Sequence, residues 1–318
     1  MAIITVTSNG ILTPETLGEY PFGGLLSATP QSVVVCNLPR YSSTSYTGVY
    51  SGTFTTNIAG DITGTVTGFS FGYKTTPFLT ITGLSVNATQ LFAMVGTGNV
   101  QGLTDLFFAG NDVINAQNYQ ATYGPGQIVN GLAGNDLVYG SRGTDDLRGG
   151  VGQDTLYGAL SHDTLMGEAG DDLLYGESGN DFLQGGAGRD LLAGGWDADT
   201  LVGGVGADQL YGGLGADLFI WTNLQDSRVG GANRDTVQDF FATDGDKIDL
   251  SALDAKAGVK GNQAFVWVEA FDGLAGALRV QSTAQGCVIL ADTNGDNAAD
   301  FAVDIFGTAT VSAADFIL

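Results

Sequence analysis

The chain has 318 residues, 50 of them glycine, and a net charge of -23 at pH 7, because 34 acidic residues outnumber 11 lysines and arginines. A balance this acidic disfavours binding to nucleic acid or to anionic membrane surfaces. No apolar segment is long enough for a transmembrane helix, and the six prolines fit neither collagen nor a proline-rich disordered chain. The length suits two or three structural units.

Residues 1–125 predict a small, mostly β unit. Short runs rich in Thr, Val, Ser and Tyr come first, and two helical patterns follow at 87–96 and 99–110, each opened by Asn and closed by Gly. The half-repeat AGNDVIN stands alone at 109–115. GFSFG at 68–72 matches a nucleophile elbow, but no helix pattern follows it and no histidine partner exists, so we interpret it as coincidence.

Residues 126–220 contain a nine-residue internal repeat. Aspartate recurs ten times without a slip, at Asp136, Asp145, Asp154, Asp163, Asp172, Asp181, Asp190, Asp199, Asp208 and Asp217. Five places before each stands a glycine: Gly131, Gly140, Gly149, Gly158, Gly167, Gly176, Gly185, Gly194, Gly203 and Gly212. Two places after each stands an apolar residue, from Val138 to Phe219. Such a period indicates a solenoid and not a flexible linker.

Each repeat provides a glycine-rich turn and a short strand whose central side chain points inward. Two repeats then make one full turn of a flattened coil, with strands stacked about 4.8 Å apart. A column of carboxylates would line each edge, and like charges at that spacing repel unless a cation lies between them. Carboxylate and carbonyl oxygens together favour Ca²⁺ over metals that prefer sulfur or imidazole.

The repeats GGAGRDLLA (185–193) and GGLGADLFI (212–220) resemble the RTX nonapeptide, whose fold is a right-handed, calcium-binding parallel β-roll. The resemblance implies that each Ca²⁺ lies between repeats i and i+2, bound by the aspartates and the turn carbonyls of the glycines named above. Ten repeats offer eight such pairs, so about eight ions are expected in the roll. Ser161 and Asp197 replace a glycine two places before the aspartate, and are expected to weaken their turns.

Residues 221–318 resemble the C-terminal region of serralysin-type secreted metalloproteases, in GADLFIWTNLQDSRVGGANRDTVQDFF and in ADTNGDNAADFAVDIFG. The resemblance implies a β-rich cap, with Asp239 and Asp246 completing the last calcium sites. It also implies an uncleaved export signal, here ending in Asp315-Phe316-Ile317-Leu318, that type I secretion machinery reads. The N-terminus has no Sec-type signal features, so export by this route and an extracellular location are expected. We interpret DTNGDNAAD (292–300) as a hairpin turn in preference to a calcium loop.

The expected fold is therefore mainly β: an N-terminal β unit with two short helices, a parallel β-roll, and a β-rich cap. The chain has one histidine, His162, and no HExxH motif, so protease activity is not expected. The predicted function is that of a secreted, non-enzymatic calcium-binding module that folds on Ca²⁺ and contacts an extracellular protein or polysaccharide. The alternative is an exported hydrolase or small-ligand carrier with its site in residues 1–125.

Two smaller expectations concern side chains far apart in the sequence. Cys36 and Cys287 are expected to be isolated thiols and not a disulfide. A row of outward tyrosines spaced by multiples of 18 is expected to be covered by the N-terminal unit or by another chain; it comprises Tyr139, Tyr157, Tyr175 and Tyr211.

Overall fold

A computed structural model describes the strands within residues 24–87 by their backbone, and beyond them residues 111–115, 125–230, 233–307 and 311–318. The chain forms two compact units, one of residues 1–120 with 130–141 and the other of residues 121–129 with 142–318. The helices expected at 87–96 and 99–110 lie outside the described residues, apart from Asn87, which ends a strand.

The first unit contains an antiparallel sheet that changes to parallel pairing at its last step. Strands β1 to β5 pair in chain order, β5 pairs antiparallel with β6, and β6 pairs parallel with β8. Their bounds are β1 Gly24–Thr29, β2 Ser32–Cys36, β3 Tyr46–Thr56, β4 Ile62–Tyr73, β5 Thr76–Asn87, β6 Val113–Asn115 and β8 Leu137–Tyr139. The predicted β character of this unit is confirmed for these strands.

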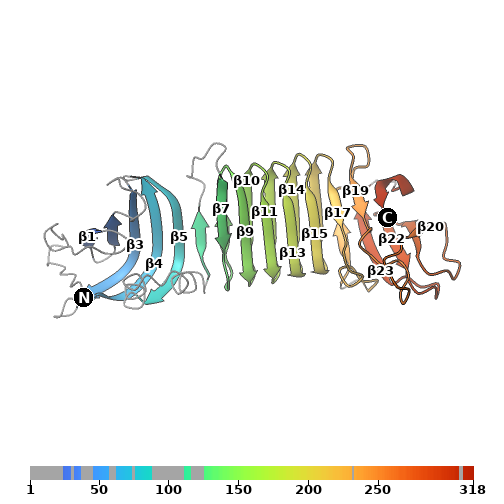
Figure 1. Cartoon of the computed structure of the whole chain (residues 1–318), viewed down its shortest axis with the longest axis horizontal. Coiled ribbons are helices and arrows are strands. Elements are labelled where there is room, and N and C mark those ends of the chain that lie inside the picture. Colours follow the sequence, from blue (N-terminus) through green and yellow to red (C-terminus); the bar gives the residue numbers. More distant parts are fainter. Residues whose placement is uncertain are drawn as a thin grey trace. The chain divides into compact units, whose positions relative to one another are not determined.

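The second unit is a parallel roll whose successive strands alternate between two sheets. One sheet has the order β7-β9-β11-β13-β15-β17-β19-β24, and its central strands lie side by side in Figure 1. Its bounds are β7 Pro125–Asn130, β9 Thr144–Val151, β11 Thr164–Ala169, β13 Phe182–Gly188, β15 Thr200–Gly206, β17 Leu218–Ile220, β19 Lys247–Asp249 and β24 Phe316–Ile317. The short 3-10 helix Ala313–Asp315 precedes β24.

The opposite sheet of this unit runs β10-β12-β14-β16-β18-β23-β22-β21-β20. Pairing is parallel from β10 to β23, and β21, β22 and β23 pair antiparallel to one another. The bounds are β10 Thr155–Leu160, β12 Leu173–Ser178, β14 Leu191–Trp196, β16 Gln209–Leu214, β18 Asp235–Val237, β20 Val266–Trp267, β21 Ala277–Ser282, β22 Gly286–Asp292 and β23 Phe301–Phe306. The predicted parallel β-roll with a β-rich cap is therefore confirmed.

The core of the roll is the column of apolar residues two places after each aspartate. Every one of them is 0% exposed: Val138, Leu147, Leu156, Leu165, Leu174, Leu183, Leu192, Leu201, Leu210 and Phe219. The column continues after the repeats lose their phase, because Val237 and Ile248 are also 0% exposed and lie in strands that extend each sheet. Burial of this column is the main source of hydrophobic stabilisation of the roll.

The tyrosines of the outward row are each half-exposed. Within the second unit, the parallel register places Tyr157 next to Tyr175, and their rings stack with centroids 4.9 Å apart. Ala193 takes the next place and Tyr211 the one after it. Stacking accounts for part of the burial of these rings, and their covering by another unit or chain stays a prediction.

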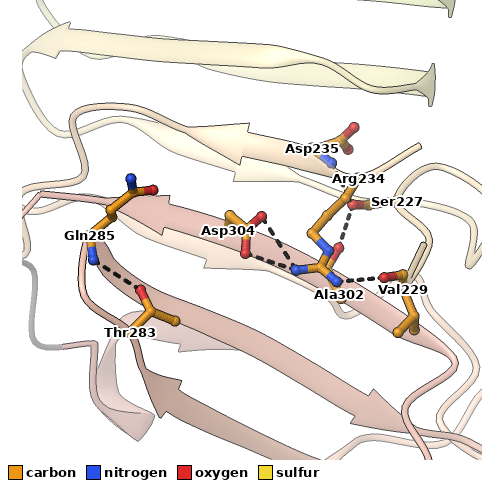
Figure 2. A network of polar contacts seen from close by, with 8 residues as sticks. All are labelled: Ser227, Val229, Arg234, Asp235, Thr283, Gln285, Ala302 and Asp304. Carbon is orange, nitrogen blue, oxygen red and sulfur yellow. Dashed lines mark hydrogen bonds and ion pairs between the residues drawn. The ribbon is translucent and has the colours of Figure 1, made fainter. Parts of the chain in front are cut away.

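The cap closes the end of the roll around Trp221 and Phe301, which are both 0% exposed and meet edge to face at 6.2 Å. Figure 2 shows the polar network beside them. The N–H of Asp235 donates to Ser227 Oγ at 2.9 Å, and the Ser227 hydroxyl donates to the carbonyl of Ala302. Arg234 Nη1 lies 3.0 Å from Asp304 Oδ1. These contacts join the segment after the repeats to β23.

The segment 292–300 connects β22 and β23 as a hairpin loop. Asp292 Oδ1 accepts the N–H of Gly295 at 2.6 Å, and its Oδ2 accepts the N–H of Asn297 at 2.9 Å. The preference for a turn over a calcium loop is consistent with these bonds, which use both carboxylate oxygens of Asp292. Cys287 on β22 is a buried free thiol. Within the described residues, no helix has the length and apolar character needed to cross a bilayer.

Candidate metal centre

The repeat aspartates form two carboxylate columns in the second unit. In each column, Oδ1 of one aspartate accepts the backbone N–H of the aspartate 18 residues earlier, at 2.8–2.9 Å. The pairs run from Asp145–Asp163 to Asp199–Asp217, so these pairs of repeats i and i+2 lie together as the sequence predicted. All ten repeat aspartates of the chain are at most 2% exposed.

The second oxygen of these carboxylates is the unusual feature. Oδ2 is buried and has no hydrogen-bond donor in seven aspartates of the second unit: Asp163, Asp172, Asp181, Asp190, Asp199, Asp208 and Asp217. A buried polar atom left without a partner costs about 1–3 kcal/mol, and more when it carries charge. Seven such atoms in register indicate that the fold is built around a missing positive partner.

Backbone carbonyls point at the same places as these oxygens. A methyl group on Gly185 would lie 2.4 Å from Asp190 Oδ2 and 2.6 Å from the carbonyl oxygen of Gly203. The same arrangement recurs along the roll at Gly158, Gly167, Gly176 and Gly194, each against an aspartate Oδ2 and a glycine carbonyl of the second repeat onward. Glycine is required here because a side chain would occupy the space that the oxygens share.

The remaining predicted glycines take related places. Gly149, Gly203 and Gly212 each lie against Oδ2 of the aspartate five residues later, where a methyl group would approach to 2.3–2.6 Å. Gly131 and Gly140 are buried. No three His, Cys, Asp or Glu side chains converge among the residues that the structure describes. Most ligands of a bound ion would therefore be backbone carbonyls, which suits a hard cation such as Ca²⁺.

The electrostatics of the columns oppose ionisation in the absence of a cation. Burial, with smaller contributions from neighbouring aspartates, raises the pKa of Asp163, Asp190 and Asp199 to about 8. Burial likewise raises the pKa of Asp172 and Asp181 to about 6, against the ordinary value of 3.8. A divalent cation beside each carboxylate would remove this penalty.

The two non-glycine turns predicted to be weak keep the local backbone of the others. Ser161 has φ +86° and Asp197 has φ +76°, both in the left-handed region that the glycines at this position also occupy. L-residues enter that region at a cost of about 1–2 kcal/mol. These turns are therefore strained but formed.

Both columns end on aspartates whose second oxygen is bonded. Asp235 Oδ1 accepts the N–H of Asp208 at 2.9 Å, and its Oδ2 accepts the indole N–H of Trp221 at 2.7 Å. Asp246 Oδ1 accepts the N–H of Asp217 at 3.0 Å, and its Oδ2 accepts the N–H of Phe241 at 2.7 Å. Asp235 and Asp246 thus close the columns with protein donors in place of an open oxygen.

The predicted ligand Asp239 lies beside the last turn of the repeats. Its carboxylate accepts the N–H groups of Gly212 at 2.8 Å and Gly213 at 3.0 Å. Burial raises the pKa of Asp239, and also that of Asp246. Metal binding by these two residues stays a prediction, and the structure assigns both a role in holding turns.

Sequence reasoning missed two members of the columns, Asp112 and Asp235. Both carry the trio of the repeats, since Ile114 and Val237 follow two places after them. Insertions put them 24 residues before Asp136 and 27 after Asp208, so a search at a fixed period of nine does not reach them. The trio of acid, any residue and buried apolar residue was the available signal.

A second row of side chains, one place before the aspartates, holds the turns from outside. The N–H of Asn180 donates to His162 Nδ1 at 2.7 Å, and the N–H of Arg189 donates to Asp171 Oδ1 at 2.8 Å. The single histidine is therefore a structural acceptor on an exposed turn. Side chains of residues 1–110 lie outside the described residues, so the structure offers no test of a site there.

Comparisons with known proteins fit this geometry. The family model described as "Peptidase M10 serralysin C terminal" matches residues 62–318. Two subunits of the mannuronan C5-epimerase from Azotobacter vinelandii are similar solved structures, each 27% identical to this chain. The first comparison covers 53% of this chain and 80% of that chain with a TM-score of 0.31, and the second covers 48% and 90% with a TM-score of 0.36. A search of curated protein sequences gave no match.

Proposed function

Because the chain belongs to the serralysin C-terminal family, we propose that it is a secreted calcium-binding protein whose β-roll folds on extracellular Ca²⁺. The observation that carries this proposal is the register of buried, unpartnered Asp Oδ2 atoms opposite glycine carbonyls, from Asp163 to Asp217. Those aspartates and glycines would hold the ions between repeats two apart. The ions would supply the positive charge that lets neighbouring carboxylates lie one strand apart.

Calcium binding and folding are coupled in this proposal, because the sites consist of residues that meet only in the wound coil. The binding free energy then becomes folding free energy. Extracellular calcium modules bind at about 10⁻⁴–10⁻³ M, a concentration far above that of resting cytosol. The roll would stay open inside the producing cell and close outside it.

Export by type I machinery fits the place of the C-terminus. Phe316 and Ile317 form β24, which pairs parallel with β19 at the end of one sheet. Lys247 Nζ donates to the carbonyl of Ala314 at 2.9 Å just before this strand. A tail held in a sheet is not accessible as an extended signal, so recognition of the tail would precede closing of the roll.

The function proposed for the folded protein is that of a non-enzymatic structural or interaction module. The family match is to the C-terminal region of serralysins, which is the non-catalytic part. The single histidine is committed to a turn through its bond to Asn180. The outward faces of the roll, including the stacked Tyr157 and Tyr175, would be available to an extracellular protein or polysaccharide.

The test is a calcium titration of the chelator-treated full chain, followed by calorimetry and by far-UV circular dichroism. We expect several ions to bind cooperatively as β-structure forms, with magnesium at equal concentration giving neither signal. A chain with full β-structure in excess chelator would contradict the coupling. A chain that takes up no calcium would contradict the function itself.

A further inference from the structure

Asp112 lies outside the phase of the nonapeptides but makes the same backbone step as the repeat aspartates. Its N–H donates to Asp136 Oδ1 at 2.8 Å, as the N–H of Asp145 does to Asp163 Oδ1. Its carbonyl accepts the N–H of Leu137 at 2.8 Å. Ile114, two places on, is 1% exposed. Residues 112–114 therefore form one more rung, within the first unit.

The side chain of Asp112 has the open oxygen that marks the column. Asp112 is 2% exposed, and its Oδ2 is buried without a hydrogen-bond partner. Burial, with the charge of Asp136, raises the pKa of Asp112 to about 7. The two terminal aspartates Asp235 and Asp246 differ from it, since protein donors satisfy their second oxygens. At this end of the column nothing among the described residues takes that place.

The strand that Asp112 opens is the junction between two kinds of pairing. On one side β6 pairs parallel with β8, with Val113 opposite Leu137. On the other side it pairs antiparallel with β5, with Thr82 opposite Val113 and Thr80 opposite Asn115. Strand β6 has only three residues, so few backbone bonds hold it. Its position depends strongly on what fixes Asp112.

A second side chain supports the same turn. Asn111 Oδ1 accepts the N–H of Asn135 at 2.8 Å, in the manner of the outer row of the roll. Asn111 and Asp112 thus reproduce both side-chain bonds of a repeat turn, although the segment that follows them departs from the nine-residue period. The match of two side chains and one core residue shows that the rung is specific and not a chance approach of one acid.

We propose that Asp112 is a ligand of a Ca²⁺ ion that the nonapeptide pattern does not mark, and that this ion orders β6 and, through it, β5 at the edge of the N-terminal sheet. The inference rests on the proposed calcium-dependent function of the roll. It extends that dependence to the N-terminal sheet, where the repeats alone predict none.

The test uses the full chain and Asp112→Asn, which keeps the shape of the side chain and removes its charge. Calorimetric titration with CaCl₂ should count one ion fewer than in the unaltered chain. Hydrogen exchange in saturating calcium should show that amides of residues 76–87 and 113–115 lose protection, while those of β12 to β16 keep theirs. Ile114→Ala loosens the same strand without touching the carboxylate, and should leave the ion count unchanged.

Three results would overturn the inference. The first is an unchanged ion count with unchanged protection of residues 76–87 in Asp112→Asn. The second is an equal loss of an ion in Ile114→Ala, which would make the effect one of packing. The third is loss of the entire roll, seen by circular dichroism, because the ion would then not be specific to this junction. If the unaltered chain itself binds no calcium, the proposed function fails, and that outcome is distinct from all three.

Discussion

The indole N–H of Trp221 donates to Oδ2 of Asp235 at 2.7 Å, and both residues are 0% exposed. This bond gives the last aspartate of one column a partner that the preceding aspartates lack. Trp221→Phe keeps the ring contact with Phe301 and removes the donor. We expect the free energy of unfolding of the calcium-loaded chain to fall by about 1–3 kcal/mol, because a buried carboxylate oxygen loses its partner. Urea denaturation at fixed calcium measures this.

Trp267→Phe is the matched control for that substitution. Trp267 is a half-exposed residue that packs on Phe316 at 5.5 Å, and none of the bonds described for the columns involves it. Its replacement should cost clearly less than that of Trp221. Equal losses in the two variants would mean that the indole donor is not what closes the column.

The metal-free chain should be more stable in mild acid than at pH 8. The folded-state pKa values of about 6 for Asp172 and about 8 for Asp190 lie above the ordinary 3.8, so the folded state binds more protons than the unfolded state. This contribution is fully present below about pH 3.8 and is lost as the pH rises through 6 to 8. Far-UV circular dichroism of the chelated chain between pH 4 and pH 8 measures it.

Calcium should reverse the direction of that dependence. Protons compete with the ion for the same carboxylates, so the calcium-loaded chain should lose stability as the pH falls. Metal-free β-structure that is equal at pH 4 and pH 8 would show that the buried carboxylates do not govern folding.

Gly185→Ala should remove at least one ion from the calorimetric count. The new methyl group would lie 2.4 Å from Asp190 Oδ2 and 2.6 Å from the carbonyl of Gly203, in the space where those oxygens converge. Gly230→Ala is the control, since a methyl group there has nothing within 4 Å. An unchanged count in Gly185→Ala would place the ion elsewhere in the turn.

Asp197→Gly should stabilise the roll by about 1 kcal/mol, because glycine adopts a positive φ without the clash that an L-residue meets. The present φ of Asp197 is +76°, and its charge also contributes to raising the pKa of Asp199. Gly188→Ala should act in the opposite direction, since its methyl group would lie 1.8 Å from the carbonyl oxygen of Gly170. Thermal unfolding of both variants compares them. A destabilised Asp197→Gly chain would indicate that this carboxylate takes part in the turn.

The period of the repeat predicted most of the roll. A side chain every nine residues can face inward only if the coil closes in two repeats, so the core positions from Val138 to Phe219 followed from spacing alone. The pairing of Asp163 with Asp181 followed from the resemblance to RTX repeats and is confirmed as a geometric relationship. The turn at Asp292 followed from its Asn, Gly and Asp residues.

Other features could not be read from the period. Asp112 and Asp235 follow insertions, and only three-dimensional register shows that they continue the columns. The outer row of acceptors uses Asn111, His162 and Asp171, whose chemical types differ while their hydrogen-bonding role is the same. A bond that any acceptor can make leaves no fixed letter in the sequence.

The alternation of successive repeats between two sheets limits how this protein can change its length. Deleting 18 residues, such as 167–184, would remove one strand from each sheet and leave every later strand in its own sheet. Deleting nine would move Tyr211 and its neighbours to the opposite face and would separate β18 and β19 from the strands that they extend. Roll proteins of this kind should therefore lengthen and shorten by pairs of repeats, and an odd number of repeats should require a redesigned cap.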